Sequence, residues 1–250
     1  MKQPESAVAH YQRRRRRRLA LLAALALALI ASVALDVATG PSGMAVERLL
    51  QILRDPGSVP RVEAVIVWNV RLPYALMAVL VGAALALAGV EMQTVLDNPL
   101  ASPFTLGVSA AAAFGASLAI VLGLSLPGVP QSWMVAANAF VFALASALLL
   151  DLVARWGAMS TSGLILFGIA LVFSFNAAVS LVQFVASAEA LQGLVFWTMG
   201  SLARSSWPKL GILLLAIALL LPLSLRDTWK LTALRLGEDR AASFGIDVPR

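Results

Sequence analysis

Long apolar segments alternate with short polar ones along most of the chain. A helix needs roughly 17–25 apolar residues to cross a hydrocarbon core about 30 Å thick, and six segments reach or approach that length. These segments are Leu19–Val37, Pro73–Met92, Phe104–Leu126, Trp133–Ala154, Gly163–Val185 and Leu210–Leu225. The pattern predicts an all-α fold, a polytopic helical membrane protein with about six transmembrane helices.

The first two spans are separated by the long polar stretch Thr39–Asn69. Its apolar residues recur at the spacing of one helix face, which predicts a short surface helix. They are Met44, Val46, Leu49, Leu50 and Leu53.

The composition supports a membrane protein and argues against a nucleic-acid partner. The chain is 60% hydrophobic and only 13% charged, with a mean hydropathy of +0.87, whereas soluble domains carry about 25% charged residues. The net charge is +6, but six of the nineteen cations form one block, Arg13–Arg18, directly before the first apolar span. Such a block is typical of the cytoplasmic flank of a first membrane helix.

The distribution of cations also predicts the orientation. If the N-terminus is inside, six spans place the C-terminus inside too, with thirteen Lys and Arg in the inside segments and six in the outside ones. This excess favours a multi-pass protein of the bacterial inner (plasma) membrane with both termini cytoplasmic. The expected domains are a basic cytoplasmic N-terminal tail (1–18), a transmembrane domain (19–225) and a cytoplasmic segment (226–250).

The motifs of enzymes and cofactor sites are absent from the sequence. There is no cysteine, and hence no disulfide framework or thiolate metal site, and no cofactor is expected. A phosphate-binding loop is also missing, so the chain cannot hydrolyse ATP by itself. Any energy that it uses must come from a partner subunit or an ion gradient. A gradient-driven transporter would need a charged pair deep in the spans, and the sequence offers none.

The fifth apolar span carries the candidate pathway residues. Asn176 and Gln183 are seven residues apart and so share one face. Polar groups within a span are expected to face the bundle interior or a water-filled path. Two roles remain open for Asn176 and Gln183: they can line a pathway, or they can form hydrogen bonds between helices. Ser160, Thr161 and Ser162 precede this span, where hydroxyl groups can cap its first turn.

The segment after the last span, Leu236–Gly245, is charged, amphipathic and flanked by Gly237 and Gly245. We expect a short helix that docks into a groove of another protein. Leu236 and Phe244 would share one face of that helix, with Phe244 as the anchor and Gly245 ending it.

Several motifs in the order observed here resemble the FecCD-type permeases of importers for ferric siderophores, haem and vitamin B12. The motifs are Arg71-Leu72-Pro73-Tyr74, Asn98-Pro99-Leu100-Ala101-Ser102-Pro103, Ser160-Thr161-Ser162, Trp197-Thr198-Met199-Gly200-Ser201-Leu202 and Leu236-Gly237-Glu238 to Gly245. The resemblance covers roughly residues 19–250.

The resemblance implies a homodimer or paired permease in the lipid bilayer, a cytoplasmic ATP-binding subunit and a periplasmic substrate-binding protein. Residues of three kinds would then act in transport. They are a gate and pathway (Ser160, Thr161, Ser162, Asn176, Gln183), ATPase-coupling residues (Leu236, Gly237, Glu238, Asp239, Phe244, Gly245) and a residue that docks the binding protein (Arg71).

Two departures from the family pattern limit this reading. Tyr74 stands where the family commonly has a second arginine, and about ten spans are usual where this chain has six. We therefore expect a C-terminally truncated permease of an ATP-driven importer, most simply for ferric siderophores, working by alternating access. A haem or vitamin B12 permease, and a non-functional fragment or membrane anchor, are the alternatives.

Overall fold

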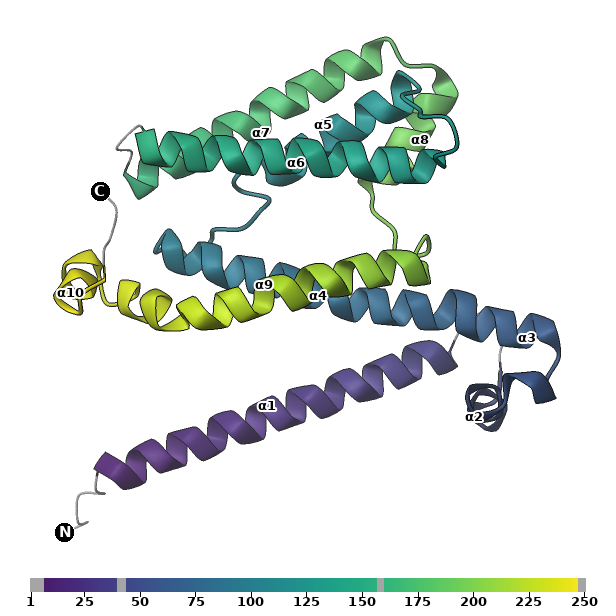
Figure 1. Ribbon diagram of the computed structural model, residues 1–250, viewed down its shortest axis with the longest axis horizontal. Helices are drawn as coiled ribbons and strands as arrows, with labels where there is room; N and C mark the ends of the chain where they lie inside the picture. Colours follow the sequence, from purple (N-terminus) through teal and green to yellow (C-terminus); the bar gives the residue numbers. More distant parts are fainter. Residues whose placement is uncertain (1–6, 40–43, 157–159, 247–250) are drawn as a thin grey trace. The chain divides into compact units, whose positions relative to one another are not determined.

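The computed structural model describes residues 7–39, 44–156 and 160–246, and within these ranges the regular structure is entirely helical (Figure 1). The helices are α1 (Ala7–Ala38), α2 (Val46–Arg54), the 3₁₀ turn η1 (Pro56–Ser58), α3 (Arg61–Val65), the π-helix η2 (Ile66–Arg71), α4 (Leu72–Val95), α5 (Val108–Val121), α6 (Gln131–Trp156), α7 (Thr161–Phe184), α8 (Ala188–Thr198), α9 (Trp207–Leu234) and α10 (Glu238–Ser243).

The predicted membrane helices are present, although the third is short. Among the described residues, five helices are long and apolar enough to cross a membrane: α1, the continuous run Arg61–Val95, α6, α7 and α9. Helix α5 has 14 residues, or about 21 Å at 1.5 Å per residue. It is shorter than its apolar segment because Gly107 (φ +81°) and Gly123 (φ +63°) take left-handed conformations on either side of it.

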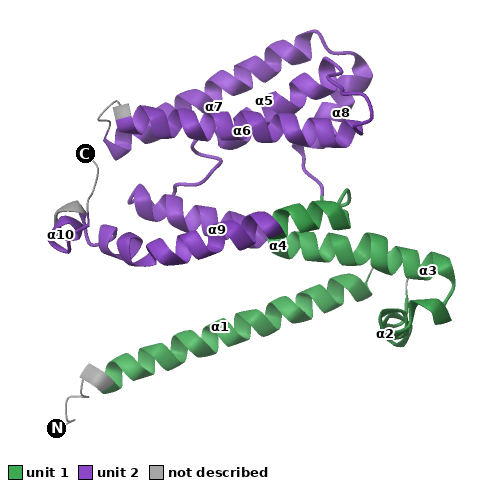
Figure 2. Ribbon diagram, in the orientation of Figure 1, with its two compact units in different colours: residues 1–81, 202–214 green, residues 82–201, 215–250 purple. Residues whose placement is uncertain are grey.

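The structure divides into two compact units (Figure 2). The first contains residues 1–81 and 202–214. Its core joins the end of α1 to α2, η2 and the start of α4 through Val37, Leu49, Ile52, Val67 and Ala75. The predicted surface helix is thus present as α2, but its buried face is formed by Leu49 and Ile52, while Val46 and Leu50 are exposed.

The second unit contains residues 82–201 and 215–250, and helix α5 packs within it against α6, α7 and α8. Small residues allow the close approach of α5 and α6: a Cβ on Gly115 would lie 2.5 Å from the carbonyl oxygen of Asn138. Ala116, Ala119 and Ala139 fill the same contact.

Two expected domain boundaries fall inside helices. Helix α1 begins at Ala7, so Arg13–Arg18 continue directly into the first span, and α9 continues beyond residue 225 to Leu234. The chain from Ala7 to Ala38 holds no Gly or Pro, and Arg is a good helix former. The basic block is therefore helical and continuous with the first span.

Candidate functional sites

Helix α7 begins at a serine cap, as the sequence predicts. The Ser160 hydroxyl oxygen accepts a hydrogen bond from the Gly163 N–H at 3.3 Å. Thr161 and Ser162 form the first turn, with Ser162 exposed and Thr161 half-buried. The three hydroxyl residues therefore lie together at one end of α7.

One face of α7 packs closely on the start of α5. A Cβ on Gly168 would lie 2.9 Å from the Leu106 Cα atom, and one on Gly107 would lie 2.8 Å from the Leu171 Cβ atom. Further along, the Phe114 and Phe175 rings have centroids 5.9 Å apart. These contacts fix one side of α7 within its unit.

Asn176 lies away from these contacts, on an exposed part of α7 beside Phe173. Gln183 is half-buried two turns further on. Within the described residues, neither side-chain amide makes a hydrogen bond to another group, so hydrogen bonding to a neighbouring helix of this chain does not account for either residue. Exposed amides within a membrane span are suited to contact with water or with a polar solute.

Helix α8 follows α7 after a short turn and also begins at a serine cap. The Ser187 hydroxyl accepts from the Ala190 N–H at 3.2 Å. Hydrogen bonds from the backbone at Glu189 and from the Ser187 side chain lower the pKa of the Glu189 carboxyl group. Leu194 is fully buried, which fixes the inner face of α8.

The segment after α9 differs from its predicted geometry. Helix α10 covers only Glu238–Ser243, and Gly237 before it has φ +100°, which is not helical. Leu236 is therefore off the helix, and the expected shared face of Leu236 and Phe244 is wrong. Both side chains are about half exposed, and the Phe244 ring lies 6.3 Å from that of Trp229 in α9.

Gly245 ends α10 as predicted. It has φ +77°, its N–H donates to the Ala242 carbonyl, and the Ile246 N–H donates to that of Ala241. This pair of bonds is the Schellman arrangement, which satisfies the last carbonyl groups of a helix. Of the predicted coupling residues, the side chains of Glu238 and Asp239 lie outside the described part of the structure.

The helix that contains Arg71 changes register just before Pro73. Ile66–Arg71 forms a π-helix, whose turns are closed by hydrogen bonds that span five residues rather than four. In this register the Leu72 N–H donates to the Val67 carbonyl. In the same register the Trp68 carbonyl would accept from the N–H of residue 73. That residue is a proline, which has no N–H. The change of register therefore leaves one acceptor, the carbonyl of Trp68, without a partner in its own helix.

Side chains distant in the sequence complete this π-helix junction, which consists of Ile66–Arg71 and the groups bonded to it. The Trp207 indole N–H donates to the Trp68 carbonyl at 2.9 Å, and the Trp68 indole N–H donates to the Ile52 carbonyl at 3.3 Å. Arg71 donates through Nη1 to the Val37 carbonyl at 2.6 Å. The starts of α9 and α4 and the ends of α1 and α2 thus meet at one junction.

Arg71 itself is buried, with 7% of its surface exposed. Its guanidinium group binds the last carbonyl groups of α1, where a cation is favoured by the helix dipole. This position favours a structural role for Arg71, and its docking role stays a prediction from the resemblance.

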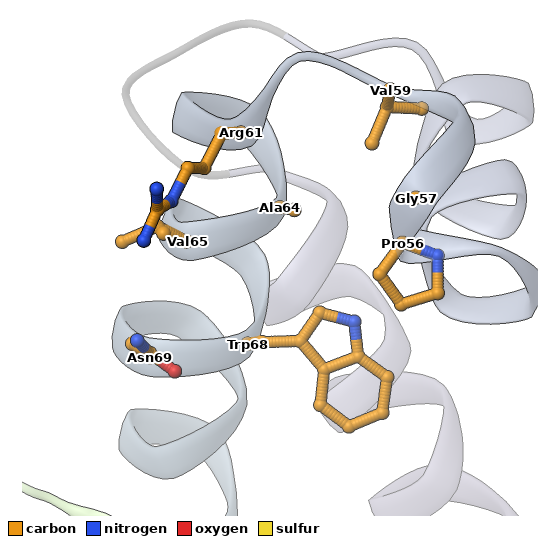
Figure 3. Close-up of a pocket in the computed structure, with 8 residues that line it drawn as sticks. All are labelled: Pro56, Gly57, Val59, Arg61, Ala64, Val65, Trp68 and Asn69. Carbon is orange, nitrogen blue, oxygen red and sulfur yellow. The ribbon is translucent and has the colours of Figure 1, made fainter.

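A hollow of about 400 Å³ opens beside the junction. One wall is the turn Pro56–Val59, and the other is a single helix face, with Arg61, Ala64, Val65, Trp68 and Asn69 spaced at three, four, seven and eight residues (Figure 3). The Trp68 ring lies toward Pro56, while Arg61, Val65 and Asn69 line the other side of the face.

The family model of the FecCD transport family matches residues 25–250. The chain belongs to this family. It is 34% identical to the molybdate import permease MolB of Haemophilus influenzae, over 90% of this chain and 67% of that protein. It is 37% identical to the hemin permease HmuU of Yersinia pestis, over 73% of this chain and 55% of that protein. A vitamin B12 permease, BtuC of Pectobacterium atrosepticum, is also 37% identical, over 75% and 55%.

A solved metal-chelate type ABC transporter in an inward-facing conformation has the same fold. It superposes with a TM-score of 0.72 at 32% identity, over 91% of this chain and 67% of that one. The chain thus spans between about half and two thirds of the length of its relatives.

Sequence patterns located most of the candidate groups of this FecCD family member but missed the π-helix junction. The sequence shows Pro73 two residues after Arg71. It does not show which group would bind the Trp68 carbonyl in place of the missing proline N–H. The partner of Trp68 is 139 residues away, and a lone tryptophan before a span has no periodic signal.

Proposed function

We propose that this chain is the permease subunit of an ATP-driven importer and that it carries a metal-chelate across the inner membrane by alternating access. The family membership supports this proposal most strongly. The relatives named above import haem, vitamin B12 and molybdate, so the shared class is a small metal-containing solute. Within that class we propose a ferric siderophore.

In this proposal the polar face of α7 belongs to the pathway. The Asn176 amide is exposed and makes no hydrogen bond to the residues that the structure describes, so a second permease copy or a bound solute could use its donors and acceptor. The Ser160–Ser162 cap would lie at the inner end of the same helix, where it would gate the passage.

ATP hydrolysis would take place on a separate cytoplasmic subunit and reach the permease through α10. Phe244 presents half of its ring to solvent, and its contact with Trp229 would transmit a displacement to α9. A periplasmic binding protein would deliver the solute to the opposite side. Both termini would be cytoplasmic.

Co-purification with the ATP-binding subunit tests this function. Phe244→Ala should reduce retention of that subunit and ATP-driven uptake, because binding energy concentrates in aromatic side chains that become buried when an interface forms. Leu225→Ala, a similarly exposed apolar change on α9, should leave both unchanged. Retention of the ATP-binding subunit at wild-type affinity by Phe244→Ala would remove α10 as the coupling element. Uptake of ferric siderophore, haem and cobalamin in parallel would identify the solute.

A further inference from the structure

The six consecutive arginines Arg13–Arg18, which we name the arginine collar, lie within a helix. Helix α1 runs without a break from Ala7 to Ala38 (Figure 1). Successive residues of an α-helix are about 100° apart around its axis, so six in a row point in every direction. All six side chains are exposed. The arginine collar therefore presents positive charge on every side of α1 rather than on one face.

The span that follows sets the depth of the arginine collar in a membrane. Leu19–Val37 has 19 residues, or about 28 Å of helix, which matches a hydrocarbon core of about 30 Å. The six arginines occupy about the next 9 Å of the same helix. The headgroup layer adds about 5–8 Å to each side of the core. The guanidinium groups thus lie at the depth of the lipid phosphates.

Protein contacts within its unit hold α1 at its opposite end. Val33, Val37 and Ala38 pack on the core of the first unit, and Arg71 donates to the Val37 carbonyl at 2.6 Å. From residue 9 to residue 32 every side chain is exposed, so the other described helices of this unit do not cover that part of α1 (Figure 2). Lipid is left to surround it.

The charge of the arginine collar is not balanced inside α1. The acidic residue that this helix contains, Asp36, lies 18 residues from Arg18, at the other end of the span. Within the described parts of the chain, Arg14–Arg18 form no ion pair. Like charges three and four residues apart on a helix repel each other. Anions from outside the chain would remove this repulsion.

Phospholipid phosphates fit the arginine collar in chemistry, position and arrangement. A guanidinium group presents parallel N–H donors that bind a phosphate through two hydrogen bonds, whereas the ammonium group of lysine acts as a point charge. The depth of the collar is that of the phosphates themselves. Charge on all sides of a helix suits a ring of lipid headgroups, whereas a protein partner would need one face.

We propose that the arginine collar is a binding site for anionic phospholipids, such as phosphatidylglycerol, in the leaflet nearest the N-terminus. Clusters of four to eight cations directly beside a membrane helix attract anionic lipid in this way. Bound headgroups neutralise the collar and hold the N-terminal half of α1 at the membrane surface, as Arg71 holds its other end. The proposal is independent of the importer function and of the transported solute.

Electron spin resonance of spin-labelled lipids tests the site. The chain is reconstituted in phosphatidylcholine vesicles that contain traces of spin-labelled phosphatidylglycerol or phosphatidylcholine, and the share of each lipid immobilised by the protein is measured. We expect about a threefold or greater preference for phosphatidylglycerol, which falls as salt screens the charges. Replacing all six arginines of the collar by glutamine should bring the ratio close to one.

Six lysines at the same positions provide a matched comparison. They keep the charge and the signal for membrane orientation but lose the paired hydrogen bonds. This variant should retain a reduced preference for phosphatidylglycerol. An equal loss in the lysine and glutamine variants would contradict the proposal, because phosphate binding requires the charge that lysine retains.

Two half-collar variants distinguish a lipid ring from a single protein-binding face. On a helix the two halves are Arg13, Arg14 and Arg17 on one side and Arg15, Arg16 and Arg18 on the other. Replacing either half by glutamine should remove about half of the preference, since lipid reaches both sides alike. A loss confined to one half would mean that a protein partner uses the block, and the proposal would be wrong.

A control with the same loss of charge completes the test. It replaces three exposed arginines near the end of α9 and in α10 by glutamine, namely Arg226, Arg235 and Arg240. This variant should keep most of the preference. If it loses as much as a half-collar variant, net charge rather than the collar attracts the lipid. Equal association of the two lipids with the wild-type chain, or a preference that survives the six glutamines, would also overturn the proposal.

Discussion

The indole N–H of Trp207 donates to the main-chain carbonyl of Trp68 at 2.9 Å, across 139 residues of sequence. The π-register at Leu72 and the missing N–H of Pro73 explain why that carbonyl is available. The indole thus replaces a bond that the helix cannot make, at a site that remains open to solvent.

We expect Trp207→Phe to lower the free energy of unfolding by about 1 kcal/mol, since the ring remains while the donor is lost. Reversible unfolding in mixed detergent micelles, followed by circular dichroism, measures the change. Trp229→Phe is the matched control, because that residue is 65% exposed and its ring contact to Phe244 survives in phenylalanine.

A double-mutant cycle with Pro73→Ala tests the cause. Alanine supplies an N–H to the Trp68 carbonyl or to its neighbour, so Trp207→Phe should cost less in the Pro73→Ala background than in the wild type. Coupling between contacting groups is commonly about 0.5–3 kcal/mol. An identical cost in both backgrounds would show that the proline does not create the vacancy which the indole fills.

Arg71→Met separates a structural role from a docking role. Methionine keeps much of the aliphatic stem but removes the donors to the carbonyl groups of Val37 and Ala38. Because hydrogen bonds from charged groups contribute about 1.5–3 kcal/mol, we expect a loss of that size and faster hydrogen exchange in the last turn of α1. Arg54→Met, at an exposed cation, should change neither. Weaker binding-protein association with unchanged stability would instead support the docking role.

Glycines in the membrane helices are not equivalent. Gly168→Ala places a methyl group 2.9 Å from the Leu106 Cα atom, so we expect a loss of about 1–3 kcal/mol as α7 moves away from α5. Gly89→Ala has no neighbouring atom within 4 Å and should be neutral or stabilising, because alanine favours a helix interior. The midpoint temperatures of thermal unfolding of the two purified variants should therefore shift in opposite directions from the wild type, or the Gly168→Ala midpoint should fall clearly more.

The hydrophobic pattern predicted the membrane helices well because each is long, apolar and bounded by Pro, Gly or charged residues. It overestimated the third one, since Phe104 is apolar but lies in a turn before Gly107, and Leu126 is apolar but lies in the irregular segment after Gly123. Apolar composition alone cannot distinguish such turns from the helix that they border.

The errors near α10 and the π-helix have a different origin. Helical spacing placed Leu236 and Phe244 on one face. The backbone at Gly237 has φ +100°, so Leu236 is not part of the helix and the spacing does not apply to it. At the other end of the chain, the burial of Arg71 depends on where α1 ends in space. Tertiary contacts of this kind leave no periodic trace in the sequence.

The membrane orientation can be read with single thiols, because the chain has no cysteine of its own. The excess of cations around the termini predicts that Ser243→Cys is cytoplasmic and that Ser58→Cys, in the first loop, is periplasmic. An impermeant maleimide added to intact cells lacking their outer membrane should label Ser58→Cys alone. Labelling of Ser243→Cys under the same conditions would reverse the orientation and move the hollow to the cytoplasmic side.

Asn176 should face water if α7 lines a solute pathway. Its side chain is exposed and makes no hydrogen bond within the described residues, so Asn176→Cys should fold normally. Leu181 is the matched control: it is also exposed, but it lies five residues further on and hence about 140° around the helix. A charged, membrane-impermeant thiol reagent should modify Asn176→Cys and leave Leu181→Cys unmodified, because only a thiolate in contact with water reacts. Added solute should then slow the reaction at Asn176→Cys. Equal reactivity at the two positions would mean that α7 has no polar side, and equal protection from the reagent would place Asn176 in lipid or at a dry interface with a second copy.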